Sequence, residues 1–314
     1  MNYSIIIPFY NESLNIDSLH GELAELIKKS SSDERKFELI YIDDGSTDNT
    51  FKKLNHLEKK NFDLKIIRNN KNLSQSLALY NGINNSKFDN LIFLDGDGQN
   101  DPNDITKMLF EFEKGNDLVH GYRKNRKDYF FTKTMPSLIA NYIVRIISKS
   151  KIKDHGCTLK IIKKKLLNKQ ILWGDFHRLL AARLSSEKIN IVQLETNHRH
   201  RKYGVSNYGF ARIFKVFIDL IYLNLFHGSK TKNFYFIGFL GLISLFLSFL
   251  STAYMLILKI FKDISFVETP LPIFSVLFII SFLIFFSILF ISHLITIMDK
   301  DDSSKKNDYE IFQK

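Results

Sequence analysis

The sequence is poor in cysteine, tryptophan and proline, with one Cys, one Trp and five Pro among 314 residues. A single cysteine excludes an internal disulfide and a zinc site built from cysteines, which is typical of a protein that faces the cytosol. The N-terminal segment MNYSIIIPFYNE has no basic leader, and its apolar run is too short for a signal peptide. We interpret this segment as the first strand of a domain.

Charge is missing from two long stretches in the C-terminal third. Residues 234–258 carry no charged side chain, and residues 273–298 are interrupted only by His293. Each stretch exceeds the roughly 20 apolar residues that cross a bilayer core. We therefore expect two transmembrane helices and a protein embedded in a lipid bilayer. The alternative is a pair of buried core helices, but a soluble helix rarely lacks a polar face.

Positive charge is abundant elsewhere, because the formal net charge is +11 and the basic residues cluster from Arg123 to Lys232. This distribution predicts anionic partners such as nucleotide phosphates or lipid head groups. The membrane spans argue against nucleic acid. The loop 259–272 is nearly neutral, whereas residues 199–232 are strongly basic. The positive-inside rule therefore places the N-terminal domain in the cytoplasm, and two spans return the polar tail there. We expect this tail, residues 299–314, to be disordered.

Apolar runs alternate with amphipathic segments in the first hundred residues. We predict strands at 3–8, 37–42, 64–68 and 91–94, and helices at 15–30, 50–59 and 74–84. This alternation indicates an α/β fold with a mostly parallel sheet and helices on both faces. In such sheets ligands bind at the carboxyl ends of the strands. The polar stretches 8–12, 43–48 and 95–101 each follow a strand, so we expect them to converge on one site.

The stretch LDGDGQNDP carries the chemistry that points to a metal. Asp95 and Asp97 are two residues apart, so both carboxylates can reach one cation. Gly96 adds no bulk, Gln99 adds a neutral oxygen, and Asp101 adds a further charge or a helix cap. Hard oxygen ligands with open positions suit Mg²⁺ or Mn²⁺ that holds a diphosphate. The alternative is an acidic turn that caps a helix.

Seven stretches occur in an order that matches a known family: IIIPFYNE, DDGSTDNT, LDGDGQNDP, GYRKNRKD, KDHGCTLKIIKK, GDFHRLLA and HRHRKYGVSNYG. With the two spans behind them, the sequence resembles the family 2 glycosyltransferases of the GT-A fold. More narrowly, it resembles the polyprenyl-phosphate sugar synthases, the dolichol-phosphate mannosyltransferase-like group. The resemblance runs from Ile5 to Met298. It implies an inverting enzyme that moves one hexose from a UDP- or GDP-sugar to undecaprenyl or dolichyl phosphate, with Mg²⁺ or Mn²⁺.

The resemblance also implies roles for individual residues. Those expected to bind the nucleotide sugar are Pro8, Tyr10, Asn11, Glu12, Asp43, Asp44, Gln75, Asp95 and Gly96. Those expected to hold the metal are Asp95, Asp97 and Gln99. Those expected at the acceptor phosphate are Arg126, His177, Arg178, Arg199, Arg201 and Ser206. The catalytic set is Asp97, Asp154, Arg123 and Arg126.

Some of these roles have alternatives. Asp154 is either a general base or the residue that orients an arginine, and a lipid phosphate acceptor is already an anion that needs no strong base. His177 is either a site residue or a structural histidine, and we interpret Cys157 as a packed side chain. The sequence departs from the family at Asn207, where many members carry Lys, and at 179–181, where an aromatic-Ile-Pro triplet is usual.

We divide the chain into a catalytic domain at 1–208, a juxtamembrane segment at 209–232, the two spans within 233–298, and the tail. Residues 210–225 have the charge spacing of an amphipathic helix in the membrane interface. Two other functions stay open. One is a family 2 transferase that acts on another lipid-linked or glycan acceptor, and the other is a non-catalytic membrane-binding protein. A dimer or tetramer is also open.

Overall fold

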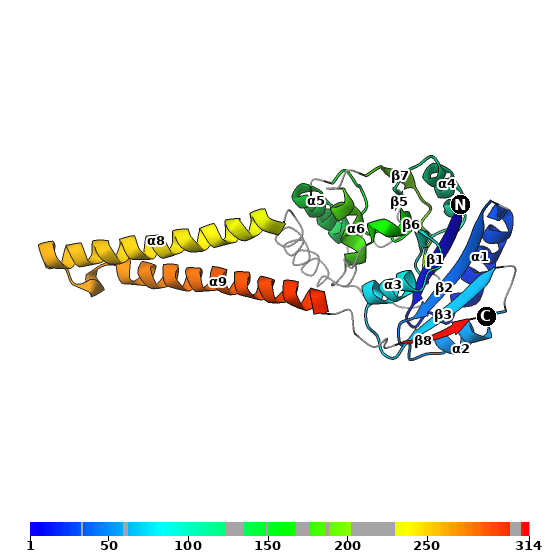
Figure 1. Ribbon diagram of the computed structural model, residues 1–314, viewed down its shortest axis with the longest axis horizontal. Coiled ribbons are helices and arrows are strands. Elements are labelled where there is room, and N and C mark those ends of the chain that lie inside the picture. Colours follow the sequence, from blue (N-terminus) through cyan, green and yellow to red (C-terminus); the bar gives the residue numbers. More distant parts are fainter. Residues whose placement is uncertain are drawn as a thin grey trace. The chain divides into compact units, whose positions relative to one another are not determined.

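The computed structural model describes residues 1–32, 34–58, 62–123, 135–148, 150–167, 176–185, 189–201, 230–301 and 309–313. The chain divides into two units, residues 1–221 with 307–314, and residues 222–306. The first unit is a sheet covered by helices and the second is a helical hairpin (Figure 1). The unit boundary falls inside the predicted juxtamembrane segment, whose own limits stay a prediction.

One mixed sheet forms the centre of the first unit. Its strands are β1 (Asn2–Phe9), β2 (Lys36–Asp43), β3 (Asp63–Asn69), β4 (Asn90–Phe93), β5 (Leu118–Tyr122), β6 (Lys160–Lys163), β7 (Ile191–Glu195) and β8 (Tyr309–Gln313). Their order is β7-β5-β6-β4-β1-β2-β3-β8. The pairs β1–β2, β1–β4, β2–β3 and β5–β7 are parallel, whereas β4–β6, β5–β6 and β3–β8 are antiparallel. The four strands predicted from the sequence are confirmed, and each of their ends lies within one residue of the prediction.

Helices cover both faces of this sheet, as predicted (Figure 1). They are α1 (Ile16–Ser30), α2 (Thr50–His56), α3 (Gln75–Asn84), α4 (Asp104–Glu113), α5 (Met135–Ser148) and α6 (Phe176–Leu184). Successive side chains of a strand point to opposite faces. Ile5 and Ile7 therefore join the core cluster that contains residues of α1, α2 and α4. Ile6 faces α3, where a Cβ on Gly82 would lie 2.5 Å from Ile6 Cγ2.

The prediction of a disordered tail is wrong for residues 309–313, which form β8. This strand pairs antiparallel with β3 at the edge of the sheet, drawn in red beside β3 in Figure 1. The edge of β3 offers unpaired backbone groups, so a short strand can add there even in a polar tail. Phe312 supplies the packing, because its ring centroid lies 5.4 Å from that of Phe51 in α2.

The second unit consists of α8 (Lys230–Lys262) and α9 (Leu271–Asp301). Segments Ile237–Lys262 and Leu271–Ile291 are long and apolar enough to cross a membrane, with mean hydropathies of 2.0 and 2.9. Few of their side chains are buried, which weighs against the alternative of soluble core helices. Polar contacts join the two helices: Ser248 Oγ donates to the Ser275 carbonyl at 3.0 Å. The predicted amphipathic helix at 210–225 lies outside the described residues.

Candidate active site

The turns that follow β1 and β2 are hydrogen-bonded to each other. Asn11 has a φ of 55°, a left-handed conformation that asparagine tolerates better than most residues. Its Oδ1 accepts from the backbone N–H groups of Thr47 at 2.8 Å and Asp48 at 3.3 Å. The N–H of Glu12 donates to Thr50 Oγ1 at 3.0 Å. The first two polar stretches therefore converge, as their positions at strand ends predicted.

The loop after β4 packs directly on the end of β1. A Cβ on Gly96 would lie 2.5 Å from Phe9 Cδ1 and 2.8 Å from the Pro8 carbonyl oxygen. Close contact with β1 therefore requires a glycine at this position. The contact of Gly96 with the nucleotide sugar stays a prediction. Tyr10, in the same turn, is 36% exposed and lies where an incoming ligand can reach it.

The carboxylates of Glu12, Asp95 and Asp97 lie close together where these stretches meet, and Arg201 bridges Asp97 and Glu12. Arg201 Nη2 lies 2.7 Å from Asp97 Oδ2, and its Nη1 lies 3.3 Å from Glu12 Oε1. Burial raises the pKa of Asp95, and the neighbouring charge of Asp97 raises it further. Burial also raises the pKa of Glu12 to about 7, against the opposing effect of Arg201. A further cation at this cluster would offset the burial of the carboxylates and the repulsion between Asp95 and Asp97.

Asp95 and Asp97 fit a divalent metal that a substrate helps to ligate. Gln75 Nε2 donates to Asp95 Oδ1 at 2.6 Å and so orients that carboxylate. Among the described residues, no three His, Cys, Asp or Glu side chains are grouped to form a complete metal cage. Mg²⁺ commonly takes one or two carboxylates and completes its shell with phosphate oxygens and water. The Gln99 amide nitrogen instead contacts the Arg199 carbonyl at 3.4 Å, so its metal role stays a prediction.

The segment 198–201 lies along the loop that carries Asp97. The N–H of Arg199 donates to the Gln99 carbonyl at 2.8 Å, and an isolated antiparallel bridge joins His198 to Asn100. This backbone pairing places Arg201 beside Asp97. The sequence order alone gave no indication of this contact.

The other residues predicted at the acceptor phosphate have different surroundings. The guanidinium of Arg199 lies 2.7 Å from Glu22 and 2.7 Å from Asp101, so both carboxylates hold it. Arg178 in α6 is buried, and its charge acts on Asp95. Their acceptor roles stay predictions. Arg126, Ser206 and the side chain of His177 lie outside the described residues.

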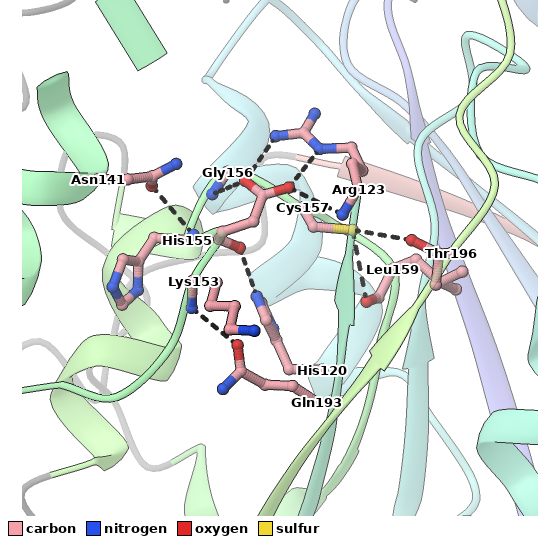
Figure 2. Close-up of polar contacts among 11 residues, drawn as sticks. His120, Arg123, Asn141, Lys153, His155, Gly156, Cys157, Leu159, Gln193 and Thr196 are labelled. Carbon is pink, nitrogen blue, oxygen red and sulfur yellow. Dashed lines mark hydrogen bonds and ion pairs between the residues drawn. The ribbon is translucent and has the colours of Figure 1, made fainter. Parts of the chain in front are cut away.

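Asp154 and Arg123 form a buried, two-pronged ion pair at the end of β5 (Figure 2). Arg123 Nε donates to Asp154 Oδ2 at 2.7 Å, and Nη2 donates to Oδ1 at 2.9 Å. The backbone N–H groups of Arg123 and Gly156 add contacts of 3.2 Å each. Since four donors surround this carboxylate, the geometry favours its orienting role over that of a general base.

Sequence reasoning missed Lys160, which is buried in β6 and interacts electrostatically with Asp154 and Arg123. Burial lowers its pKa to about 8, and the charges of Cys157, Asp95 and Asp154 oppose that shift. A lysine inside the apolar run TLKII was the available signal, because buried lysines need a charged or polar partner. Cys157 is buried as expected of a packed side chain, and burial raises its thiol pKa to about 11.

The buried side chains of Asp43 and Asp44 accept hydrogen bonds that fix the turn after β2. Asp44 accepts from Asn69 Nδ2 at 2.8 Å and from the backbone N–H groups of Leu73 and Ser74 at 3.0 and 3.1 Å. Asp43 Oδ1 accepts from the Ser46 N–H at 3.2 Å. Both side chains are buried, and burial raises both pKa values. They hold the turn that the nucleotide is predicted to contact.

The chain is similar to several known proteins. The sequence model described as Glycosyl transferase family 2 matches residues 4–176. The chain is 34% identical over 247 residues to dodecaprenyl-phosphate galacturonate synthase of Rhizobium johnstonii. The matched residues make up 77% of this chain and 72% of that protein. The chain is 31% identical over 220 residues to undecaprenyl-phosphate 4-deoxy-4-formamido-L-arabinose transferase of Proteus mirabilis, covering 69% and 66%. Glucosyl-3-phosphoglycerate synthase from Mycobacterium tuberculosis, solved with Mn²⁺, UDP-glucose and phosphoglyceric acid, aligns with a TM-score of 0.48 and 16% identity over 70% of this chain and 77% of that one.

Proposed function

Since the chain belongs to glycosyl transferase family 2, we propose that it moves a single hexose from a UDP- or GDP-sugar to a polyprenyl phosphate, with inversion. It is a glycosyltransferase with an α/β GT-A fold, and its two apolar helices make it a membrane protein. One observation carries the proposal. Arg201 bridges Asp97 and Glu12 at the carboxyl ends of the parallel strands, in a chain with two membrane-length helices. The names of the two curated relatives support the polyprenyl acceptor.

At the donor end, Asp95 and Asp97 would hold Mg²⁺ or Mn²⁺. When bound, this ion neutralises the charge that develops on the departing nucleoside diphosphate. Gln75 fixes the orientation of Asp95, and the bonded turns around Asn11 and Asp44 form the floor of the nucleotide pocket. These hydrogen bonds would fix the groups that we propose to hold the base and ribose.

At the acceptor end, arginine side chains orient an anionic phosphate rather than deprotonate it. Asp154 holds the Arg123 guanidinium in one plane, which suits two-point contact with phosphate oxygens. Arg201 lies 2.7 Å from Asp97, the carboxylate that would also help to hold the metal. We infer that a cation held there would compete with Arg201 for this carboxylate and would leave the guanidinium available to a phosphate.

The proposed location is the cytoplasmic face of a bacterial inner membrane or its equivalent, with both termini in the cytoplasm. Strand β8 lies in the same sheet as β1, so the two ends of the chain belong to one folded unit. An even number of membrane crossings agrees with this arrangement and with the basic residues before the first span. Reporter fusions at residues 1 and 314 test it, and a periplasmic signal from either fusion would contradict it.

Incubation of membranes with radiolabelled UDP- and GDP-sugars tests the function. The proposal predicts label in the organic extract as a lipid-linked sugar phosphate that mild acid releases, and no such label with Asp97→Ala. Acid-stable or water-soluble labelled product would favour another lipid-linked or glycan acceptor. Absence of any transfer would favour the non-catalytic alternative. A screen of glucose, mannose and N-acetylhexosamine donors for thermal stabilisation with Mn²⁺ would identify the sugar.

A further inference from the structure

The C-terminal strand lies on the part of the sheet that supports the predicted nucleotide pocket. Strand β8 follows α9, which contains the second candidate span, and pairs with β3 from Lys65 to Asn69. Its register places Glu310 opposite Arg68 and Tyr309 opposite Asn69, the last two residues of β3. Parallel strands carry their ligand sites at this carboxyl end.

One set of contacts leads from β8 to Asp43 through aromatic rings. Phe312 packs against Phe51 of α2 with ring centroids 5.4 Å apart. The guanidinium carbon of Arg68 lies 4.2 Å from the centroid of the same Phe51 ring. Arg68 Nε in turn lies 3.9 Å from Asp43 Oδ2. Loss of the Phe312 ring should therefore make the position of the Arg68 guanidinium, which faces the buried Asp43 carboxylate, less well defined.

A second set leads from β8 to Asp44 through asparagine side chains. Asn85 Nδ2 donates to the Tyr309 hydroxyl at 3.1 Å and to the Asn81 carbonyl at 2.8 Å. Asn81 Nδ2 donates to Asn69 Oδ1 at 2.9 Å, and Asn69 Nδ2 donates to Asp44 Oδ1 at 2.8 Å. Asn81 and Asn69 are both buried, so each of these bonds restricts the next side chain.

We propose that the C-terminal strand is a positioning element of the donor-nucleotide pocket. It fixes the carboxyl end of β3, and through Arg68 and Asn69 it fixes the turn formed by Asp43 and Asp44. This inference rests on the proposed function, which places the nucleotide at that turn. Its consequence is that residues beyond the second membrane-length helix, at the far end of the chain, set the affinity for the donor.

The experiment compares two truncations in neighbouring residues of β8 in the full-length protein in detergent. Phe312→Ala removes the ring that contacts Phe51, whereas Ile311→Ala removes an apolar side chain that is 45% exposed. Isothermal titration calorimetry in the presence of Mn²⁺ first shows whether the wild-type protein binds UDP or GDP. The Kd for that nucleotide is then measured for each variant. An aromatic pair of this kind predicts a rise in Kd of about three- to tenfold for Phe312→Ala. Ile311→Ala should leave the Kd unchanged.

Steady-state kinetics separate positioning from a general loss of folded protein. Positioning raises the KM for the nucleotide sugar by the same factor and leaves kcat and the KM for a short-chain polyprenyl phosphate unchanged. Loss of folded protein lowers kcat and leaves both KM values alone. Phe312→Tyr should restore donor affinity. Adding Phe312→Ala to Phe51→Ala should weaken binding no further than Phe51→Ala alone, because Phe312 acts through the Phe51 ring.

Several results would overturn the inference. It fails if Phe312→Ala binds the nucleotide as wild type does, or if Ile311→Ala weakens binding equally. Tyr309→Phe removes only the hydroxyl that Asn85 contacts and serves if Phe312→Ala does not fold. It should raise the Kd in the same direction, and an unchanged Kd would overturn the inference. If wild type binds neither UDP nor GDP, the proposed function itself fails and this inference with it.

Discussion

The ion pair between Arg123 and Asp154 gives the sharpest test of how this site works. Asp154→Asn keeps the shape of the side chain and removes its charge. The pair is buried, with 12% of the Arg123 side chain and 5% of the Asp154 side chain exposed. Arg123 would keep its charge and lose its carboxylate partner. The substitution therefore separates a residue that orients an arginine from one that accepts a proton.

The size of the effect follows from that burial. Removing one partner of a buried ion pair costs about 3–5 kcal/mol, because the other charge is left uncompensated. We expect the lower end, about 3 kcal/mol, since asparagine can still accept one hydrogen bond from the guanidinium. For a domain of this size such a loss lowers Tm by about 6–12 °C. Misplacement of the guanidinium by about 1 Å predicts a loss of transfer of about a hundredfold.

The assay is a double-mutant cycle with Arg123→Met, read by thermal unfolding and by transfer to a short-chain polyprenyl phosphate. The doubly substituted protein carries neither charge, so it should be more stable than the sum of the single losses by about 1 kcal/mol or more. Its activity should be no lower than that of Arg123→Met alone. Additive losses in activity would refute the orienting role and would return Asp154 to the role of a base.

Three further predictions concern the carboxylate cluster. Asp97→Ala should abolish metal-dependent transfer and leave Tm within a few degrees of wild type; activity within a few-fold of wild type would exclude Asp97 as a metal ligand. Burial raises the Glu12 pKa from 4.5 to about 7, so between these two values the folded chain keeps a proton that the unfolded chain has lost. The contribution of Glu12 therefore lowers the free energy of unfolding as the pH rises from 4.5 to about 7. In EDTA, Glu12→Gln should remove this part of the decline in Tm between pH 5 and 8, and an unchanged slope would contradict the assignment. Arg201→Ala should raise the KM for a short-chain acceptor in neutral micelles and leave donor binding unchanged. Arg201→Lys should restore the acceptor KM poorly, because lysine cannot make the two-pronged contact of a guanidinium. Normal acceptor kinetics would leave Arg201 a role in charge balance alone.

Local patterns in the sequence predicted the parallel part of the sheet well. Each strand from β1 to β4 combines an apolar run with a polar turn at its carboxyl end, and both signals lie within a few residues. The convergence of the turns then follows from the direction of parallel strands. The contact of Gly96 with Pro8 and Phe9 was harder to foresee, because a glycine that avoids a clash and one that admits a ligand look the same in sequence.

Features that depend on distant partners could not be predicted in this way. Arg201 and Asp97 are 104 residues apart, and the backbone pairing of His198 and Arg199 with the loop brings them together. Strand β8 is five residues long and lies in a polar tail, so its strand character depends on the open edge of β3. The charges that act on Lys160 come from Asp95 in the loop after β4 and from Cys157 and Asp154 in the loop before β6. No short stretch of the sequence contains all of them.

The two arginines of the site differ in what holds them, and the difference assigns them different tasks. Arg123 Nε and Nη2 lie 2.7 and 2.9 Å from the carboxylate of Asp154, a residue that is not among the predicted metal ligands. A metal held by Asp95 and Asp97 would therefore not compete for the carboxylate that orients Arg123. Arg201 is held by Asp97 and Glu12, and a divalent cation competes for the first of these carboxylates. A metal that arrives with the donor would thus compete with Arg201 for Asp97 but not with Arg123 for Asp154. A fixed arginine suits the phosphate that reacts in every cycle, and an arginine released by the donor suits an acceptor that should be engaged only once the donor is present.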